Sequence, residues 1–344
     1  MTAVVRRVLV TGGSGFIGSH LVEALLARGD EVVVLDNLST GSLDNLAAVI
    51  DHPHLRFVQG SVLDELMVDE LMHECDSVFH LAAAVGVRLI VEQPLRSFTT
   101  NIRGSEIVLA AAHKYRRRIV LTSTSEIYGK NSTVPLREDA DRVLGSPAVA
   151  RWAYSTAKAV DEILAYVYHR ERGLPTTVIR LFNTVGPRQS PAYGMVIPRL
   201  VRQAANGQAL TVFGDGSQSR CFCHVSDVVA GMLGLFDDPR SVGEVFNLGS
   251  QEEVTILELA QRVAARAERA GWARRSGNDP VPIELIAYRD AYPVGFEDMR
   301  RRVPDTTKLR ELIGWRTTRD LDQILDEAYA EALAEPAAGP MPVR

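Results

Sequence analysis

Residues 8–18, VLVTGGSGFIG, decide the fold of this chain, because an apolar run leads directly into three spaced glycines. Gly12 permits a tight turn between a strand and a helix, and Gly15 lets the backbone approach a pyrophosphate. Gly18 allows the following helix, which is expected to begin near Phe16, to pack closely on the sheet. The N-terminus of such a helix binds phosphate groups. The stretch therefore predicts a dinucleotide-binding turn.

An acidic residue follows the second apolar run, residues 31–35, where an adenosine ribose would be recognised. Asp36 stands eighteen positions after Gly18, and its carboxylate can accept hydrogen bonds from the ribose diol and repel a 2′-phosphate. Asn37 and residues 38–40 come next, and none of them is Arg or Lys. These features favour NAD over NADP. The alternative is an aspartate that only terminates a strand.

Length and composition indicate an ordinary globular protein. A chain of 344 residues with 46% hydrophobic residues is long enough for one α/β domain and a smaller appended part. The net charge of −5 provides no basic field for a nucleic-acid backbone, and no charge-free apolar run reaches membrane-spanning length. With three cysteines and no visible secretory signal, we expect a cytoplasmic protein without nucleic-acid or membrane partners.

Strand-like apolar runs alternate with helical patterns in the first half of the chain, which predicts a Rossmann-type doubly wound α/β fold with a parallel sheet. We expect an NAD-binding domain at 1–181, a mainly substrate-binding mixed α/β part at 182–334 and a flexible tail at 335–344. Ligands of such sheets bind outside the carboxyl ends of the strands. The six expected strands are 5–10, 31–35, 55–58, 77–81, 118–123 and 176–181.

The later part of the chain is expected to contain helices at 196–206, 226–236 and 256–269, a strand at 210–213 and an exposed loop at 271–282. Cys221 and Cys223, followed by His224, invite a metal interpretation. No second ligand pair lies at zinc-site spacing, and strand alternation places both cysteines on one face as small apolar residues. We therefore predict no metal site.

Tyr154 and Lys158 lie four residues apart in a segment with helix-forming alanines, so both project from one helical face. At roughly 6 Å and an effective dielectric constant near 20, an ammonium favours the phenolate by about 3 kcal/mol, or about two pKa units. A tyrosine with its pKa lowered in this way can act as a base near neutral pH. The alternative is a pair on the surface of a helix.

The fifth expected strand ends in TSTSEIYG, residues 122–129, which places polar side chains at the carboxyl edge of the sheet. Thr124 offers a hydroxyl that can share the substrate proton with Tyr154. Glu126 is either a helper base or a cap for the loop.

With these residues, nearly the whole chain resembles the extended short-chain dehydrogenase/reductase family of nucleotide-sugar epimerases, dehydratases and decarboxylases. The motifs that carry the resemblance, besides GGSGFIG and YSTAK, are HLAA at 80–83, TNIRGS around Asn101, RLFNTVGPR at 180–188 and SRCFCHVSD at 219–227. One departure is Ser61, where the family usually has an aspartate near the adenine.

The resemblance implies a function for each motif. Thr124, Tyr154 and Lys158 would be the catalytic trio, assisted by Glu126. Ser125, Asn183, Arg220 and Arg302 would contact the substrate, a nucleotide-linked sugar with UDP favoured. Contacts to NAD would come from Gly12, Gly15, Phe16, Ile17, Gly18, Asp36, Asn37, Leu81, Ala82, Asn101, Tyr154 and Lys158.

The shared chemistry of the family is oxidation of the sugar at carbon 4 by bound NAD, reaction of the ketone and return of the hydride. The Ser125–Glu126 pair, RWAYSTAK at 151–158 and GFEDMRRRVPD at 295–305 are similar to the decarboxylase branch, including UDP-xylose synthases. Within the last motif only Arg302 is assigned to the site; the alternative is a solvated run of charges at 300–302.

We therefore expect first a UDP-glucuronate decarboxylase-like lyase, then a sugar dehydratase, then a nucleotide-sugar 4-epimerase. A non-catalytic NAD-sensing protein and a plain ketoreductase are the alternatives from other classes. The resemblance also suggests a homodimer through residues near 101–115 and 154–170.

Overall fold

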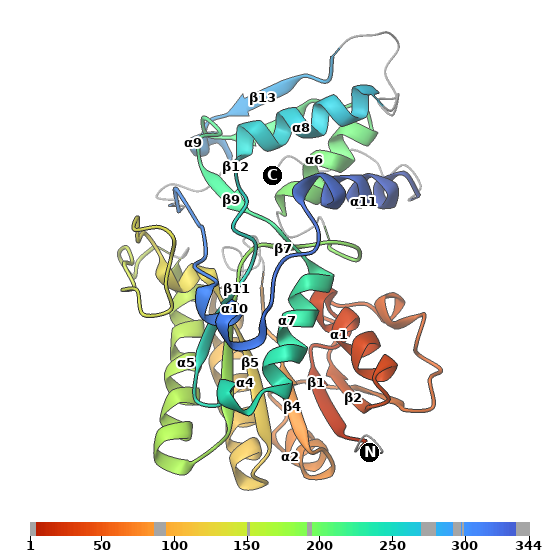
Figure 1. Ribbon diagram of the computed structural model, residues 1–344, viewed down its shortest axis with the longest axis vertical. Helices are drawn as coiled ribbons and strands as arrows, with labels where there is room; N and C mark the ends of the chain where they lie inside the picture. Colours follow the sequence, from red (N-terminus) through yellow and green to blue (C-terminus); the bar gives the residue numbers. More distant parts are fainter. Residues whose placement is uncertain are drawn as a thin grey trace.

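The computed structural model describes residues 5–85, 94–149, 152–190, 195–269, 280–291, 297 and 299–334. These residues form a larger α/β part and a smaller part that lies at the carboxyl edge of its sheet (Figure 1). The expected tail at 335–344 and most of the expected loop at 271–282 lie outside the described residues.

A seven-stranded sheet forms the centre of the larger part, with the order β11-β6-β5-β4-β1-β2-β3 and parallel pairing throughout. The Rossmann-type prediction and its six strands are confirmed. The strands are β1 (Arg7–Thr11), β2 (Glu31–Asp36), β3 (Leu55–Gln59), β4 (Ser77–His80), β5 (Arg118–Thr124), β6 (Thr176–Leu181) and β11 (Val245–Leu248).

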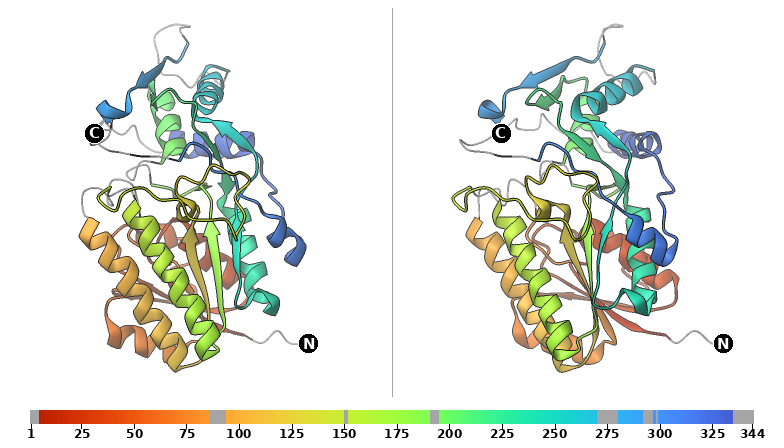
Figure 2. Two further views of the ribbon diagram at one scale, coloured as in Figure 1. Left: turned by 90° about the vertical axis from the view of Figure 1, so that its left-hand side faces the viewer. Right: turned by 60° about the vertical axis from the view of Figure 1, so that its left-hand side comes forward.

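Alternation along each strand divides the core between the two faces of the sheet. In β1, Val8 and Val10 pack with the helices of one face, whereas Leu9 packs with those of the other face. Helices α1 (Phe16–Ala27), α7 (Val225–Asp237) and α10 (Thr307–Ile313) cover the first face, and α2 (Glu65–Glu74), α4 (Pro94–Lys114) and α5 (Ala153–Arg172) cover the second (Figure 2).

The strand β11 was not among the six strands expected from the sequence. This strand has only four residues, VFNL, and pairs with β6 after more than sixty intervening residues. Because α7 also packs on the large sheet, the segment after residue 181 contributes to both parts of the molecule.

The smaller part has its own apolar core, formed mainly by three helices and the strands between them. The expected elements at 196–206, 210–213, 226–236 and 256–269 are confirmed, with small shifts at the ends. Its elements are β7 (Thr184–Val185), α6 (Val196–Ala205), β8 (Leu210–Phe213), β9 (Ser219–Cys221), β10 (Cys223–His224), β12 (Glu253–Thr255), α8 (Ile256–Arg269), β13 (Ile283–Ile286), α9 (Tyr288–Ala291) and α11 (Leu321–Ala334).

Residues 299–305, which we call the strap, connect the two parts. The strap is bonded to the larger part because Leu136 N–H donates to the Val303 carbonyl at 2.8 Å and Asp305 N–H donates to the Leu136 carbonyl at 2.8 Å. It is bonded to the smaller part because Ser219 N–H donates to the Arg300 carbonyl at 3.0 Å. In Figure 1 this blue segment runs down from the smaller part toward α10.

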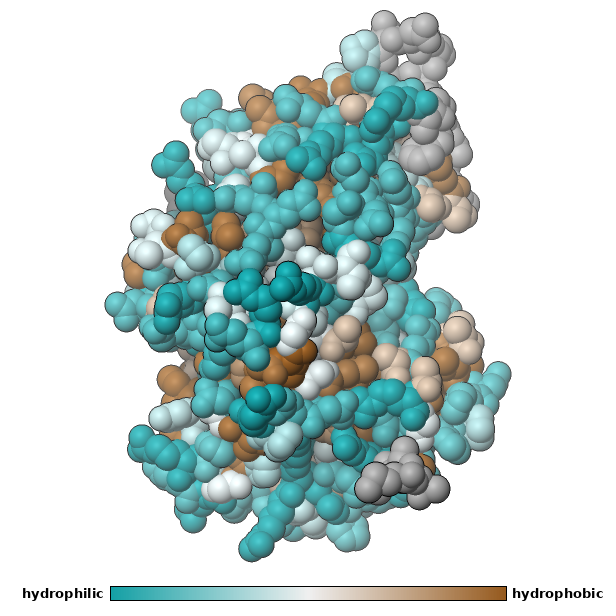
Figure 3. Space-filling view, viewed as in Figure 1, coloured by the Kyte–Doolittle hydropathy of each residue, from teal (hydrophilic) through white to brown (hydrophobic). Residues whose placement is uncertain are grey.

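The surface seen in Figure 3 is mostly hydrophilic, and its outline is indented where the two parts meet. Among the described helices, none combines the length and the apolarity that crossing a bilayer requires.

Candidate active site

A crevice of about 1130 Å³ lies at the carboxyl ends of the strands, between the two parts. Pockets for one drug-sized ligand measure about 300–1,000 Å³, so this crevice has room for more than one small molecule. Its wall includes the glycine turn after β1, the ends of β2 and β5, and residues of the strap and of the smaller part.

The glycine turn has the geometry of a phosphate cradle. Gly12 has φ +75°, and a Cβ at this position would lie 2.7 Å from the backbone nitrogen of Ala82. Gly15 N–H donates to the Gly12 carbonyl at 3.1 Å, and Gly15 is the N-cap of α1. A Cβ on Gly18 would collide with the backbone of Gly12. Backbone N–H groups at this helix start can therefore approach an anion without obstruction by side chains.

Asp36 lies beside this turn at the end of β2, and its side chain is buried. Its carboxylate accepts hydrogen bonds from Ser14 N–H at 2.9 Å and from Leu38 N–H at 2.8 Å. A buried carboxylate held by backbone donors can accept from a ribose diol and repels a phosphate in the same place. The chemistry of these residues fits NAD.

The end of β5 supplies three polar side chains to the crevice. Thr124 is the N-cap of the short helix η2 (Ser125–Tyr128), because its Oγ1 accepts from Glu126 N–H at 3.2 Å. Ser155 on α5 donates from Oγ to the Glu126 carbonyl at 2.8 Å, which fixes η2 against α5. Thr124, Ser125 and Glu126 all line the crevice.

Tyr154 and Lys158 lie on one face of α5, but only Tyr154 is exposed to the crevice. Tyr154 lines the crevice and is 8% exposed, whereas Lys158 lies behind the wall and is 2% exposed. The Lys158 Nζ lies 2.8 Å from the Asp161 Oδ2, and Asp161 is fully buried.

The expected lowering of the Tyr154 pKa by Lys158 is wrong for this structure. Burial raises the pKa of Tyr154 far above its usual value, and the carboxylates of Glu126 and Asp161 raise it further. Asp161 pairs with the ammonium and offsets its charge. The expected lowering took account of the cation at position 158 but not of the anion one turn later.

Arg302 enters the crevice from the strap. Its Nη1 lies 3.7 Å from the Glu126 Oε1 and donates to the Ser125 Oγ at 3.3 Å. The neighbouring Arg301 is exposed and instead pairs with Glu253 at 2.7 Å. The interpretation of 300–302 as a solvated charge run is therefore wrong for Arg302.

Two further residues that were predicted to contact the substrate, Asn183 and Arg220, also line the crevice. Asn183 donates from Nδ2 to the Cys221 carbonyl at 2.9 Å, and the buried Arg220 donates from Nη1 to the Ser219 carbonyl at 2.7 Å. These bonds to β9 hold both side chains beside the junction of the two parts.

The predicted site residues line the crevice, with two exceptions: Lys158 and Asn101. Asn101 accepts from Ala84 N–H at 2.7 Å and donates to the Ala84 carbonyl at 3.2 Å, so it braces the loop after β4 from behind. Several lining residues of the smaller part were not predicted from the sequence. Among them only Arg188 lies in a motif that could have indicated it, at the GPR end of residues 180–188. The missed residues include Arg188, Arg199, Phe213, Gln218 and Tyr288.

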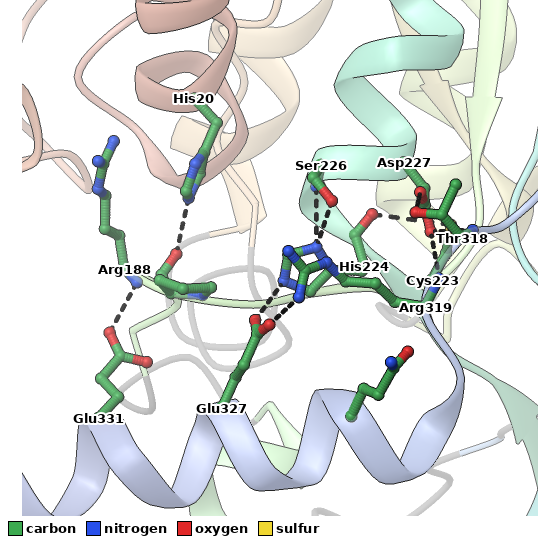
Figure 4. Close-up of polar contacts among 12 residues, drawn as sticks. His20, Arg188, Cys223, His224, Ser226, Asp227, Thr318, Arg319, Glu327 and Glu331 are labelled. Carbon is green, nitrogen blue, oxygen red and sulfur yellow. Dashed lines mark hydrogen bonds and ion pairs between the residues drawn. The ribbon is translucent and has the colours of Figure 1, made fainter.

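A polar junction cluster joins α1 to α11 beside the crevice (Figure 4). Arg188 has φ +70° and reaches both helices: its N–H donates to the Glu331 Oε1 at 2.8 Å, and its Nη2 lies 2.6 Å from the Glu23 Oε1. His20 on α1 bonds through Nε2 to the Pro187 carbonyl at 3.0 Å. The glycine turn and the smaller part are thus tied together through the chain around Arg188.

His224 belongs to the same junction. Its Nε2 lies 2.8 Å from the Glu327 Oε2, and its Nδ1 lies 2.6 Å from the Ser226 Oγ (Figure 4). Cys221 and Cys223 are buried free thiols. Within the described ranges, no group of three or more His, Cys, Asp or Glu side chains is arranged to hold a metal ion.

Comparison with known proteins gives consistent matches over nearly the whole chain. Residues 9–328 match the family model described as GDP-mannose 4,6 dehydratase. The chain is 38% identical to a UDP-N-acetyl-alpha-D-glucosaminuronate decarboxylase of Bacillus cytotoxicus, over 94% of this chain and 96% of that protein. It is 36% identical to UDP-glucuronic acid decarboxylase 6 of Arabidopsis thaliana, over 90% and 83%.

A solved structure shares the same fold. The UDP-glucuronic acid 4-epimerase of Bacillus cereus, in complex with UDP-glucuronic acid and NAD, superimposes with a TM-score of 0.82 at 27% identity, covering 95% of this chain and 98% of that one.

Proposed function

Because the chain belongs to the GDP-mannose 4,6-dehydratase-like family of extended short-chain dehydrogenases/reductases, we propose that it is an NAD-dependent decarboxylase of a UDP-linked hexuronic acid. The observation that carries the proposal is the position of Arg302, whose guanidinium enters the crevice beside Glu126 and Ser125. A guanidinium recognises a carboxylate through two parallel charge-assisted hydrogen bonds. An uncharged hexose offers no such partner.

In the proposed reaction Tyr154 accepts the proton of the sugar hydroxyl at carbon 4, and Thr124 orients that hydroxyl. The glycine turn and Asp36 would hold NAD, which would supply the hydride acceptor for this oxidation and the hydride for the later reduction. The oxidised sugar is then a β-keto acid, and the carbon–carbon bond to the carboxylate breaks with release of carbon dioxide. The electron pair remains on the sugar as an enolate, which takes up a proton before the ketone is reduced.

Glu126 and Arg302 have complementary tasks in this scheme. Arg302 would bind the substrate carboxylate before it leaves, and Glu126 would hold the guanidinium in position or deliver a proton to the enolate. Both side chains are mostly buried, so these interactions would take place where water screens charge weakly.

The sugar dehydratase is the second candidate because Glu126 at the end of β5 can also remove a proton from carbon 5. Its neighbour Ser125 is not an acid that can protonate a leaving hydroxyl. The 4-epimerase is the third candidate and would leave Glu126 without a chemical task.

The test is the product mass after incubation of the purified chain with UDP-glucuronate, UDP-N-acetylglucosaminuronate, UDP-glucose and dTDP-glucose, without added reductant. Loss of carbon dioxide from either uronate supports the proposal and selects the sugar. Loss of water from a hexose selects the dehydratase, and an isomer of unchanged mass selects the epimerase. No loss of carbon dioxide from either uronate contradicts the proposal, and no reaction with any of the four directs the search to other nucleotide-linked sugars.

We further infer that two copies pair through α4 and α5, which lie side by side (Figure 2). Apolar side chains on these helices are exposed: Leu95, Phe98, Ile163, Tyr166 and Val167. Ile163→Asp should therefore convert a dimer to a monomer in light scattering, whereas Leu66→Asp, at a still more exposed apolar position on α2, should not. An unchanged dimer in Ile163→Asp contradicts this interface.

We also propose that the protein resides in a reducing compartment such as the cytoplasm, because of the state of its three cysteines. Cys75, Cys221 and Cys223 are all buried free thiols, and burial raises the pKa of Cys75 and Cys221 to about 12. Such thiols behave as apolar core residues and do not form a disulfide framework.

A further inference from the structure

A buried tyrosine lies between the two segments that carry the Arg302–Glu126 pair. Tyr128 is the last residue of the short helix η2, which also contains Glu126, and its side chain is fully buried. Its hydroxyl accepts a hydrogen bond from the Arg180 Nη1 at 2.8 Å and donates to the Asn247 Oδ1 at 2.6 Å. Burial raises the pKa of Tyr128 to about 12, so the phenol keeps the proton that it donates to Asn247.

Asn247 connects this phenol to the strap. It lies on β11 and is fully buried. Its Nδ2 donates to the Leu136 carbonyl at 2.8 Å and to the Asp305 carbonyl at 3.2 Å, and Leu136 is the residue of the larger part to which the strap is bonded. Asp305 stands three positions after Arg302. The side chain of Asn247 therefore joins the Tyr128 hydroxyl to the end of the strap.

Arg180 on β6 fixes the phenol from the other side. Its Nη2 lies 2.8 Å from the Glu162 Oε2 on α5, and both side chains are mostly buried. The same guanidinium donates from Nη1 to the Glu138 carbonyl at 2.8 Å, and Glu162 also accepts from the Ser123 Oγ on β5. The Tyr128 hydroxyl is therefore bonded to a cation that is itself held by several elements of the larger part.

The hydroxyl of Tyr128 is not needed to fill this region. The ring packs in an apolar cluster that includes Leu136 and Phe182, where a phenylalanine would occupy nearly the same space. A buried hydroxyl loses its hydration and adds only modest net stability even when its hydrogen bonds are made. A fully bonded buried polar group instead fixes the geometry of the segments that it joins. Here those segments carry the carboxylate of Glu126 and the guanidinium of Arg302.

We propose that Tyr128 is a positioning residue for recognition of the substrate carboxylate: its hydroxyl, through Asn247, sets the strap relative to η2 and so aligns Arg302 with Glu126. The inference rests on the proposed function, in which Arg302 binds the carboxylate of the sugar. Tyr128 is not among the described residues that line the crevice, so it acts through the strap and η2 and not by touching the ligand. Loss of its hydroxyl should therefore weaken binding of an acidic sugar selectively.

The test compares ligands that differ only at carbon 6 of the sugar. Calorimetry measures the Kd of UDP-glucuronate against UDP-glucose, and of UDP-N-acetylglucosaminuronate against UDP-N-acetylglucosamine, in the full chain saturated with NAD. Every chain carries Tyr154→Phe, so that the ligand is not consumed during the titration. In Tyr128→Phe we expect the preference for the acid to fall at least about fivefold, because misalignment weakens a two-point contact most strongly. The Kd of the neutral ligand should change less than about twofold, since its contacts do not include the carboxylate.

Tyr329→Phe is the matched control. Tyr329 is also fully buried, and its hydroxyl donates to the Val263 carbonyl at 2.7 Å in the core of the smaller part. The substitution removes a buried phenol hydrogen bond that involves neither the strap nor η2, and it should leave the preference for the acid unchanged. A loss of preference of similar size in Tyr329→Phe would mean that any buried hydroxyl has this effect, and it would overturn the specific role of Tyr128.

Asn247→Ala tests the same connection from the strap, in case Tyr128→Phe does not fold. It keeps the phenol and removes the bonds to the Leu136 and Asp305 carbonyls, and we expect the same selective loss. An unchanged preference, or equal weakening of acidic and neutral ligands, in the folded variant overturns this inference alone. If the chain with Tyr154→Phe as its one substitution prefers the acid in neither pair, the proposed function itself is contradicted and the inference with it.

Discussion

The Arg302 Nη1 lies 3.7 Å from the Glu126 Oε1, although Arg302 belongs to the strap and Glu126 to η2, directly after β5. The pair brings a cation from the later part of the chain to the carboxyl edge of the sheet. A substrate carboxylate would compete with Glu126 for the same guanidinium. In the proposed reaction, this pair would therefore connect recognition of an acidic sugar with the side chain that can deliver a proton to it.

Replacing Arg302 by lysine keeps the charge and removes the planar fork that binds a carboxylate at two points. We expect Arg302→Lys to raise the KM for a UDP-uronate about 10- to 100-fold, which corresponds to about 1.4–2.8 kcal/mol. Steady-state kinetics with product detection by mass measure this change. Arg301→Lys, at the exposed neighbour bound to Glu253, should leave the KM within about twofold. Equal effects at both positions would contradict the assignment.

Tyr154→Phe removes the proposed base without disturbing the packing of its ring. We expect kcat to fall by at least about 10²-fold, the lower range for loss of general acid–base catalysis, while NAD binding measured by calorimetry persists. Tyr166→Phe on the same helix is the control, since Tyr166 is 54% exposed. Retention of full activity in Tyr154→Phe would refute the proposed mechanism.

Asp36→Asn leaves one acceptor oxygen where two backbone donors, Ser14 N–H and Leu38 N–H, now bind the carboxylate. We expect NAD affinity to fall about 10- to 100-fold, because the ribose loses an acceptor and the turn loses a hydrogen bond. Preference for NAD over NADP should shrink at the same time, since the negative charge that repels a 2′-phosphate is gone. Calorimetric titration with both dinucleotides measures both effects, and Asp51→Asn at an exposed position is the control.

The buried His80 should make the free energy of unfolding depend on pH in the acidic range. Its Nδ1 lies 2.7 Å from the Thr11 Oγ1 and its Nε2 lies 3.1 Å from the Ser105 Oγ, and burial lowers its pKa to about 3. The unfolded chain binds a proton at this residue below about pH 6.5, and the folded chain does not until about pH 3. The free energy of unfolding should therefore decrease as pH falls between these values, by up to about 1.4 kcal/mol per pH unit.

His80→Gln tests this dependence. In urea titrations at several pH values, the variant should be less stable at pH 7.5 but should lose less stability on acidification. His54→Gln, at an exposed residue, should retain the original slope. A slope unchanged in His80→Gln would place the acid sensitivity elsewhere, with His20 and His224 as the next residues to examine because burial lowers their pKa as well.

The sequence predicted the sheet and the dinucleotide turn because both are local patterns. The glycines of residues 12–18 lie in one turn, and each of the six expected strands is an apolar run of its own. The strand β11 has only four residues and is a strand because it pairs with β6. That pairing depends on the path of the intervening chain. No local pattern contains that information.

The same distinction holds for the site. Thr124, Glu126 and Tyr154 follow strands or begin helices at the edge of the sheet, so their convergence could be predicted from topology. The position of Lys158 at i+4 was also predicted, but its burial and its pairing with Asp161 depend on how deeply α5 packs. The pairing of Arg302 with Glu126 requires the strap to cross between the two parts, which only the three-dimensional structure reveals.

The strap affects how the protein would discriminate against a ligand that binds in the wrong position. It is hydrogen-bonded to Leu136 on one side and to Ser219 on the other, so the location of its guanidinium is determined by both parts together. Tyr154, in contrast, is carried by the larger part alone. A sugar nucleotide that seats poorly and leaves the parts misaligned would meet a correctly placed phenol but a displaced guanidinium. The sugar hydroxyl would thus be positioned by the larger part alone, whereas the sugar carboxylate would be positioned by a residue held between both parts. Only a ligand that binds well to both would reach the geometry for reaction.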